Sequence, residues 1–246
     1  MARISVLDDD VSPDEPTLIE GFPGVGLVGK IATDHLIDAH EMTHYANVHC
    51  DGLPPVAVYH ESEAAATTPV RLYADPENDL VALRSDVPVN PAAATEVAAC
   101  VGSWFDEVEL FPIFLSGLGR EKDEAPPSLY GIATGDGAEA LARAEVSEPS
   151  ESGLVSGPTG AMLAAALEND RDAVGLVVES DPQFPDPEAA RVLIADGIDP
   201  IAGIETPTDG LVEQATEIRN AKQQLAEQMR QANEESSQAE PLKMFQ

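Results

Sequence analysis

Apolar and polar residues follow two kinds of period along this chain, and segments of the two kinds alternate. Runs that are apolar, or that alternate with polar residues, predict β-strands at residues 4–7, 17–22, 45–49, 56–60, 70–73, 80–84, 110–115, 129–133 and 173–178. Apolar residues three or four positions apart predict helices at residues 25–39, 91–105, 138–144, 159–167 and 187–195. Asn90, Thr159 and Asp186 are the expected N-caps. Strands alternating with helices indicate an α/β fold with a mixed, largely parallel central sheet, in which residues 70–84 form a hairpin.

The pattern changes after residue 208, where a long polar helix is predicted. Its apolar seam has 4-3-4-3 spacing, interrupted by one lysine, and consists of Leu211, Ala215, Ile218, Lys222, Leu225, Met229 and Ala232. Such a seam can associate with another copy or lie on its own domain. We therefore expect a core domain at 1–208, an amphipathic helix at 209–232 and a tail at 233–246. The candidate homo-oligomer contacts are Leu211, Ile218, Leu225 and Met229.

Charge narrows the possible partners. The 246 residues include 45 acids and 13 bases, a formal net charge of −32, and the acids are spread along the chain. A dispersed anionic surface on a folded domain is typical of a cytoplasm with molar salt, where the Debye length is about 3 Å, and we expect a haloarchaeal, cytoplasmic protein. Such a surface disfavours nucleic acid and anionic membranes as partners. The two cysteines, Cys50 and Cys100, show no motif spacing and are expected to be reduced thiols.

A glycine-rich turn follows the strand predicted at residues 17–22. Its residues are Gly21, Phe22, Pro23, Gly24, Gly26 and Gly29, and the last three glycines have the G-x-G-x-x-G spacing of a dinucleotide-binding turn. Asp51 lies where a ribose-binding acid would be expected. Pro23, however, removes a backbone donor and stiffens the turn, which favours a structural turn. The alternative is an enzyme that binds a nucleotide or nucleoside at residues 21–29.

Other candidate chemistry is sparse. The histidines are His35, His40, His44, His49 and His60, close in sequence but without the spacing of a metal motif, and no metal site is predicted. Loops at 116–120 and 156–160 lack the Walker lysine. Arg84 and Arg120 could bind an anion or form ion pairs with the abundant acids. No catalytic residue and no cofactor are assigned.

Three segments carry a resemblance to a known family. Residues 20–29 (EGFPGVGLVG), 129–134 (LYGIAT) and 180–193 (SDPQFPDPEAARVL) resemble, in this order, segments of the archaeal proteasome assembly chaperone family. The resemblance extends over about residues 17–231. It implies a nucleoside-phosphorylase-like α/β core used for assembly rather than catalysis, and hence a non-enzymatic binding protein.

The chain ends in an apolar tip behind a polar linker. Met244, Phe245 and Gln246 resemble the hydrophobic-tyrosine-any-residue terminus with which proteasome activators and archaeal assembly chaperones dock between α-subunits, although phenylalanine stands where tyrosine is usual. The resemblance implies that these three residues bind proteasome α-subunits.

Overall fold

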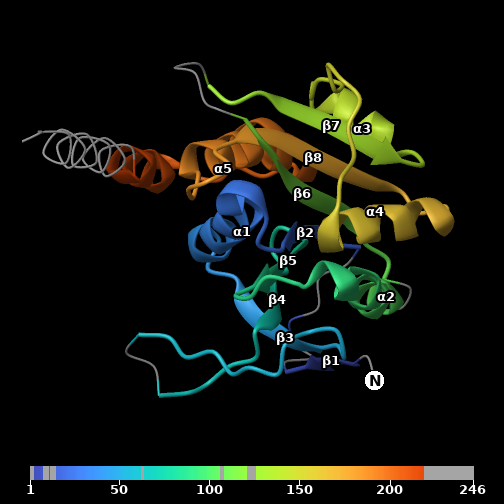
Figure 1. Cartoon of the computed structure of the whole chain (residues 1–246), viewed down its shortest axis with the longest axis vertical. Helices are drawn as coiled ribbons and strands as arrows, with labels where there is room; N and C mark the ends of the chain where they lie inside the picture. The colour runs from blue at the N-terminus through green and yellow to red at the C-terminus, as the bar shows by residue number, and fades with distance from the viewer. Residues whose placement is uncertain are drawn as a thin grey trace, which may run out of the picture.

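The computed structural model describes residues 3–7, 11, 15–61, 64–105, 108–120 and 126–218. Within these residues one eight-stranded sheet runs through the molecule (Figure 1). Its strands are β1 (Arg3–Val6), β2 (Thr17–Gly21), β3 (Thr43–His49), β4 (Val70–Asp75), β5 (Leu80–Ser85), β6 (Phe111–Gly119), β7 (Leu129–Thr134) and β8 (Ala173–Ser180). The helices are α1 (Val28–Ala39), α2 (Ala94–Phe105), α3 (Gly137–Arg143), α4 (Gly157–Glu168), α5 (Pro187–Leu193) and α6 (Asp199–Ala202), with 3₁₀ turns η1 (Val25–Leu27) and η2 (Pro91–Ala93) and the π-helical η3 (Ile194–Ile198). Residues 209–218 are also helical.

The strand order is β1-β3-β4-β5-β2-β6-β8-β7. The four strands β5, β2, β6 and β8 are mutually parallel, whereas β1, β3, β4 and β7 pair antiparallel with their neighbours. The predicted mixed sheet is confirmed, but its parallel part is confined to these central strands. The parallel strands end along one edge of the sheet, where ligands bind in open α/β folds.

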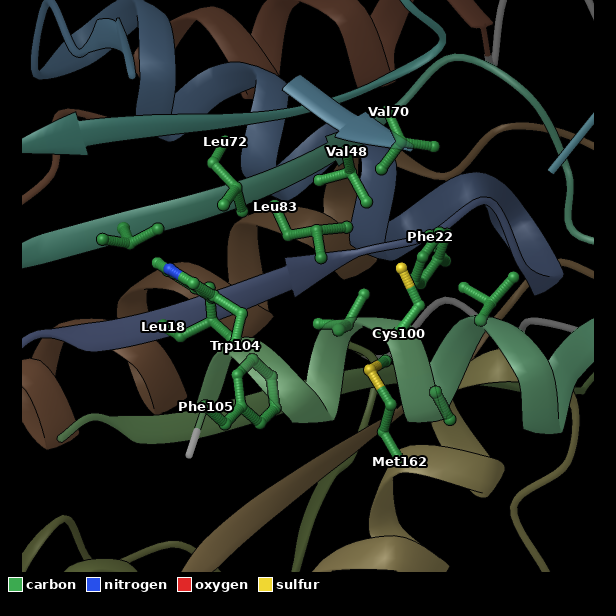
Figure 2. Packing of buried hydrophobic residues seen from close by; sticks show 14 of the residues in the cluster. Leu18, Phe22, Val48, Val70, Leu72, Leu83, Cys100, Trp104, Phe105 and Met162 are labelled. Carbon is green, nitrogen blue, oxygen red and sulfur yellow. The ribbon is translucent and has the colours of Figure 1, made fainter. Parts of the chain in front are cut away.

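Helices cover both faces of the sheet, and the two largest apolar clusters of the described residues lie one on each face. Strand β2 lies centrally and shows the alternation: Leu18 points into the core beneath α2 and α4, and Ile19 into the core beneath α1 and α5. Figure 2 shows the first core, in which Trp104 and Phe105 of α2 lie near β2 and Met162 of α4 lies below. The central strands are buried on both sides, which explains why they read as apolar runs in the sequence.

Most predicted elements are present, with some corrections. Asn90 accepts a hydrogen bond from the Ala92 amide (2.9 Å) and Asp186 one from the Ala189 amide (3.1 Å), so both caps are confirmed. The strand expected at 56–60 is wrong: only an isolated bridge from Val58 to Thr67 forms. The Val56 amide bonds the Pro54 carbonyl two positions earlier (2.9 Å), which is a local contact and not a bond of a strand ladder.

The helix after Asp186 is longer than predicted. α5 continues through η3 into α6, so the helical path runs to Ala202 rather than Ala195. Beyond it, Leu211 at the start of the helix at 209–218 is 1% exposed and packs into the core beneath α1 and α5. The first part of the predicted seam therefore lies on its own domain.

Candidate functional site

The glycine-rich turn lies at the carboxyl end of β2 and leads through η1 into α1. Gly26 has a positive φ of 62°, and its carbonyl accepts a hydrogen bond from the Asp186 amide at 2.9 Å. A Cβ atom at position 26 would lie 1.8 Å from the Ser180 hydroxyl oxygen. The second glycine of a dinucleotide turn leaves room for a pyrophosphate; here the chain's own Ser180 fills the space beside it. The turn thus packs against protein at the position where a nucleotide would approach.

The partner of this turn is the junction between β8 and α5. The Asp186 carboxylate caps α5 and also accepts hydrogen bonds from the Asp181 amide (2.9 Å) and the Ser180 hydroxyl (3.3 Å). Residues 20–29 and 180–193, two of the three segments that carry the family resemblance, are therefore in direct contact. Their contact explains why glycine is required at position 26.

A buried glutamate fixes the turn from the other face of the sheet. Glu20 is fully buried, and its carboxylate accepts hydrogen bonds from the Phe22 amide (2.7 Å), the Leu115 amide (3.3 Å) and the Thr159 hydroxyl (3.0 Å). Burial raises the pKa of Glu20 to about 7, and the three donors oppose that rise. One side chain thus links the glycine-rich turn, β6 and α4.

Thr159 has a different role from the one predicted. Ser156 occupies the N-cap position of α4, and Thr159 lies inside the first helical turn, where its hydroxyl reaches Glu20. The prediction of Thr159 as a cap was wrong because its contact lies 139 positions away in sequence. The sequence around Thr159 contains no pattern that predicts a contact with Glu20.

A charge cluster lies beside the turn, on the face covered by α1. It consists of Lys30, Asp34, Arg71, Arg84 and Asp86. The Lys30 ammonium lies 2.8 Å from Asp34 and 3.2 Å from Asp86, and the Arg84 Nε lies 2.9 Å from Asp34. Arg71, 1% exposed, binds Asp86. Of the two roles considered for Arg84, the structure shows the ion pair.

Arg120 also forms ion pairs. It contacts Glu151 and lies 3.3 Å from Glu179. The abundant acids thus engage both arginines that could have bound an external anion. Because Arg120 and Glu151 are largely exposed, their pair contributes little at high salt.

The histidines do not converge. His35 contacts the Pro207 carbonyl, His40 the Thr206 hydroxyl, and His60 the Arg71 guanidinium. His44 stacks on Tyr73 and contacts Asn47, and burial lowers the pKa of His44. In the part of the chain that the structure describes, no group of three or more His, Cys, Asp or Glu residues could hold a metal ion.

The cysteines differ from the prediction of free thiols. Cys50, after β3, and Cys100, in α2, form a disulfide with a Cα–Cα distance of 6.0 Å. The expectation of free thiols rested on the absence of a motif, and motif spacing carries no information about two residues 50 positions apart that the fold brings together. The bond ties the segment after β3 to α2.

The remaining predicted residues lie at the C-terminus. Leu211 is 1% exposed and packs against its own domain, and Ile218 is half-buried. Leu225, Met229, Met244, Phe245 and Gln246 lie outside the described residues. Over the described ranges, no helix is both long and apolar enough to cross a membrane.

The fold and the contact between the turn and the β8–α5 junction define a class of layered α/β proteins with a mixed eight-stranded sheet. Comparison with known families places the chain within that class: residues 18–226 match the PAC2 family, and the chain belongs to it. The uncharacterized protein MJ0106 of Methanocaldococcus jannaschii is 29% identical over 217 residues, covering 87% of each chain.

Two solved structures from Pyrococcus furiosus share the fold. PbaA, described as an archaeal homolog of proteasome-assembly chaperone, matches with a TM-score of 0.79 at 23% identity, covering 95% of each chain. PbaB, described as an archaeal proteasome activator, matches with a TM-score of 0.78 at 21% identity, covering 91% of this chain and 98% of that one.

Proposed function

We propose that this chain is a non-enzymatic assembly chaperone or activator that binds proteasome α-subunits, or the α-ring, through Met244, Phe245 and Gln246. The observation that carries the proposal is membership of the PAC2 family over residues 18–226, together with the shared fold of PbaA and PbaB. The glycine-rich turn supports a binding protein rather than an enzyme, because Ser180 occupies the space beside Gly26 and the Asp186 amide donates a hydrogen bond to the Gly26 carbonyl. The nucleoside-phosphorylase-like description of the core and a cytoplasmic, haloarchaeal setting are part of this proposal.

The chemistry of the tip suits a partner at high salt. Exposed ion pairs are screened beyond about 3 Å in molar salt, whereas burial of an apolar side chain is not weakened. Burying a phenylalanine ring contributes about 1.5–3 kcal/mol, which corresponds to about 10- to 150-fold in affinity for one tail. An oligomer with several tails would bind far more tightly through effective concentration.

Co-elution with proteasome α-subunits in molar KCl tests the proposal. Phe245→Ala removes the ring, and a glycine added after Gln246 displaces the terminal carboxylate; we expect each change to abolish co-elution. Gln238→Ala, in the polar linker, is the control and should co-elute as the unaltered chain does. Co-elution that survives both changes at the tip would refute the tail mechanism.

A further inference from the structure

The charge cluster beside the glycine-rich turn holds more positive than negative charge. Its cations are Lys30, Arg71 and Arg84, and its anions are Asp34 and Asp86. With all five side chains ionised the cluster carries a net charge of +1, in a chain whose formal charge is −32. The ion pairs that engage Arg84 therefore leave the cluster short of one negative charge.

The antiparallel pairing of β4 with β5 brings two of the cations together. Arg71 of β4 lies directly opposite Arg84 of β5, so both side chains leave the same face of the sheet. Like charges directly opposite each other destabilise a sheet, and a shared counter-charge offsets their repulsion. Asp86 is shared in this way, because it pairs with Arg71 and lies 3.5 Å from the Arg84 Nε, but it also pairs with Lys30 at 3.2 Å.

Both arginines have a buried nitrogen atom without a hydrogen-bond acceptor. Arg71 is 1% exposed, and while its Nη2 pairs with Asp86, its Nε has no hydrogen-bond partner. The Arg84 Nε is also buried, and its approach to Asp34 at 2.9 Å lacks the geometry of a hydrogen bond. A buried donor on a charged group is costly when no acceptor faces it. The cluster thus lacks acceptors as well as negative charge.

The other neighbours of Arg71 do not supply the missing charge. Its Nη1 donates to the Thr67 hydroxyl and lies 3.2 Å from the His60 Nε2. A guanidinium has donors only, so the His60 Nε2 accepts and this imidazole is neutral. Within the described part of the chain, no third carboxylate forms an ion pair with Lys30, Arg71 or Arg84.

We propose that this cluster binds a monoanion, and that in KCl the ligand is chloride. A water molecule could accept a hydrogen bond from an arginine Nε, but it would leave the charge of a largely buried cluster unbalanced. A chloride ion supplies the acceptor and the missing negative charge together. In molar salt the Debye length is about 3 Å, so the distant acids of the surface do not repel the ion.

Such a site gives the chain a second kind of salt dependence. Screening of the acidic surface depends on ionic strength, whichever monovalent salt provides it. Binding at a site depends on the concentration of its ligand, and it stabilises the folded chain only once that concentration exceeds the dissociation constant. The two effects separate when chloride is varied while the ionic strength stays fixed.

Urea unfolding at a constant molar potassium concentration tests the site, with chloride replacing gluconate, a carboxylate too large for a buried site. Above the dissociation constant, each tenfold increase in chloride should raise the folding equilibrium constant about tenfold, because one ion binds the folded chain. Arg71→Gln makes the cluster neutral and should remove this dependence on chloride. Arg143→Gln, at an exposed position of α3, is the matched control and should keep it.

Asp34→Asn tests the same charge count in the opposite direction. This change raises the net charge of the cluster to +2, so the chloride dependence should begin at a severalfold lower chloride concentration. Asp38→Asn, at an exposed position one turn further along α1, is the control and should leave the dependence unchanged. Because Asp34 is 32% exposed, this pair of variants decides the question even if Arg71→Gln does not fold.

Two results of the unfolding series would overturn the proposal. One is an unaltered chain whose stability does not respond to chloride, and the other is a response that is the same in all four variants, which would indicate a general effect on the surface. Crystals grown in KBr locate the ion: an anomalous bromide peak within hydrogen-bond distance of the Arg71 Nε supports the site, and its absence there refutes it. Each measurement uses the isolated full chain, so none depends on proteasome binding.

Discussion

Replacing Glu20 with glutamine should change how the stability of the fold depends on pH. Burial raises the pKa of Glu20 from 4.5 to about 7 in the folded chain, while the unfolded chain keeps the ordinary value. Below pH 4.5 the carboxyl is protonated in the folded and in the unfolded chain, and the stability that arises from the raised pKa of Glu20 is fully present. Between pH 4.5 and 7 the unfolded state ionises first, so the free energy of unfolding falls as pH rises.

The size of the effect follows from the shift. One pKa unit corresponds to about 1.4 kcal/mol, so the unaltered chain should lose about 3 kcal/mol from this group as the pH rises from 4.5 to above 7. Glutamine has no proton to release. The glutamine side chain has only one oxygen, so its NH₂ group faces the backbone N–H of either Phe22 or Leu115, donor against donor. The lost hydrogen bond lowers the free energy of unfolding by about 1–3 kcal/mol at every pH.

Urea unfolding of both chains in molar KCl from pH 4 to 9 separates the two effects. The free energy of unfolding of Glu20→Gln minus that of the unaltered chain should start negative at pH 4 and rise by about 3 kcal/mol by pH 8. Glu139→Gln, at an exposed position of α3, is the matched control for replacing one carboxylate by an amide. A flat difference for Glu20→Gln would refute the reasoning, since it would mean that Glu20 ionises alike in both states.

Two further predictions concern the turn and the disulfide. Gly26→Ala should lower the free energy of unfolding by about 2–4 kcal/mol, because φ is positive and Ser180 occupies the space for a Cβ. Gly24→Ala is the control: nothing lies within 4 Å of its Cβ position, so it should change the free energy of unfolding by less than about 0.5 kcal/mol. Equal effects of the two substitutions in thermal or urea unfolding would contradict the packing role of Gly26. Cys100→Ser should cost about 4 kcal/mol by the entropy of closing a loop of 50 residues, and a dithiol reductant should destabilise the unaltered chain but not the variant. Two titratable thiols in the unfolded, unreduced chain would show that no disulfide is present.

Elements whose signals are local could be read from the sequence. The hairpin of β4 and β5 has alternating strands around a turn at residues 75–79, and Asn90 and Asp186 cap their helices with contacts two or three positions away. Each of these contacts involves neighbours in sequence, so composition and spacing suffice to place them.

The parts that could not be read depend on distant contacts. Gly26 contacts a segment about 155 positions later, Glu20 reaches Thr159, and Cys50 meets Cys100 only because the sheet places β3 near α2. The glycine spacing indicated a special turn but not whether protein or ligand filled it. The prediction of a strand at 56–60 was wrong because a distant contact is missing there. The residues favour β-structure, but apart from one isolated bridge they have no neighbouring strand to pair with.

The Cys50–Cys100 bond also closes residues 50–100 into a covalent ring that holds β4, β5 and the whole turn between them. Tyr59, 84% exposed, lies on this ring in the segment between β3 and β4. A protease that cuts beside Tyr59 therefore severs the backbone without separating the molecule. In denaturing electrophoresis the two pieces would migrate as one chain without reductant and as two chains with it. Cleavage in this segment is therefore detected only after the disulfide is reduced.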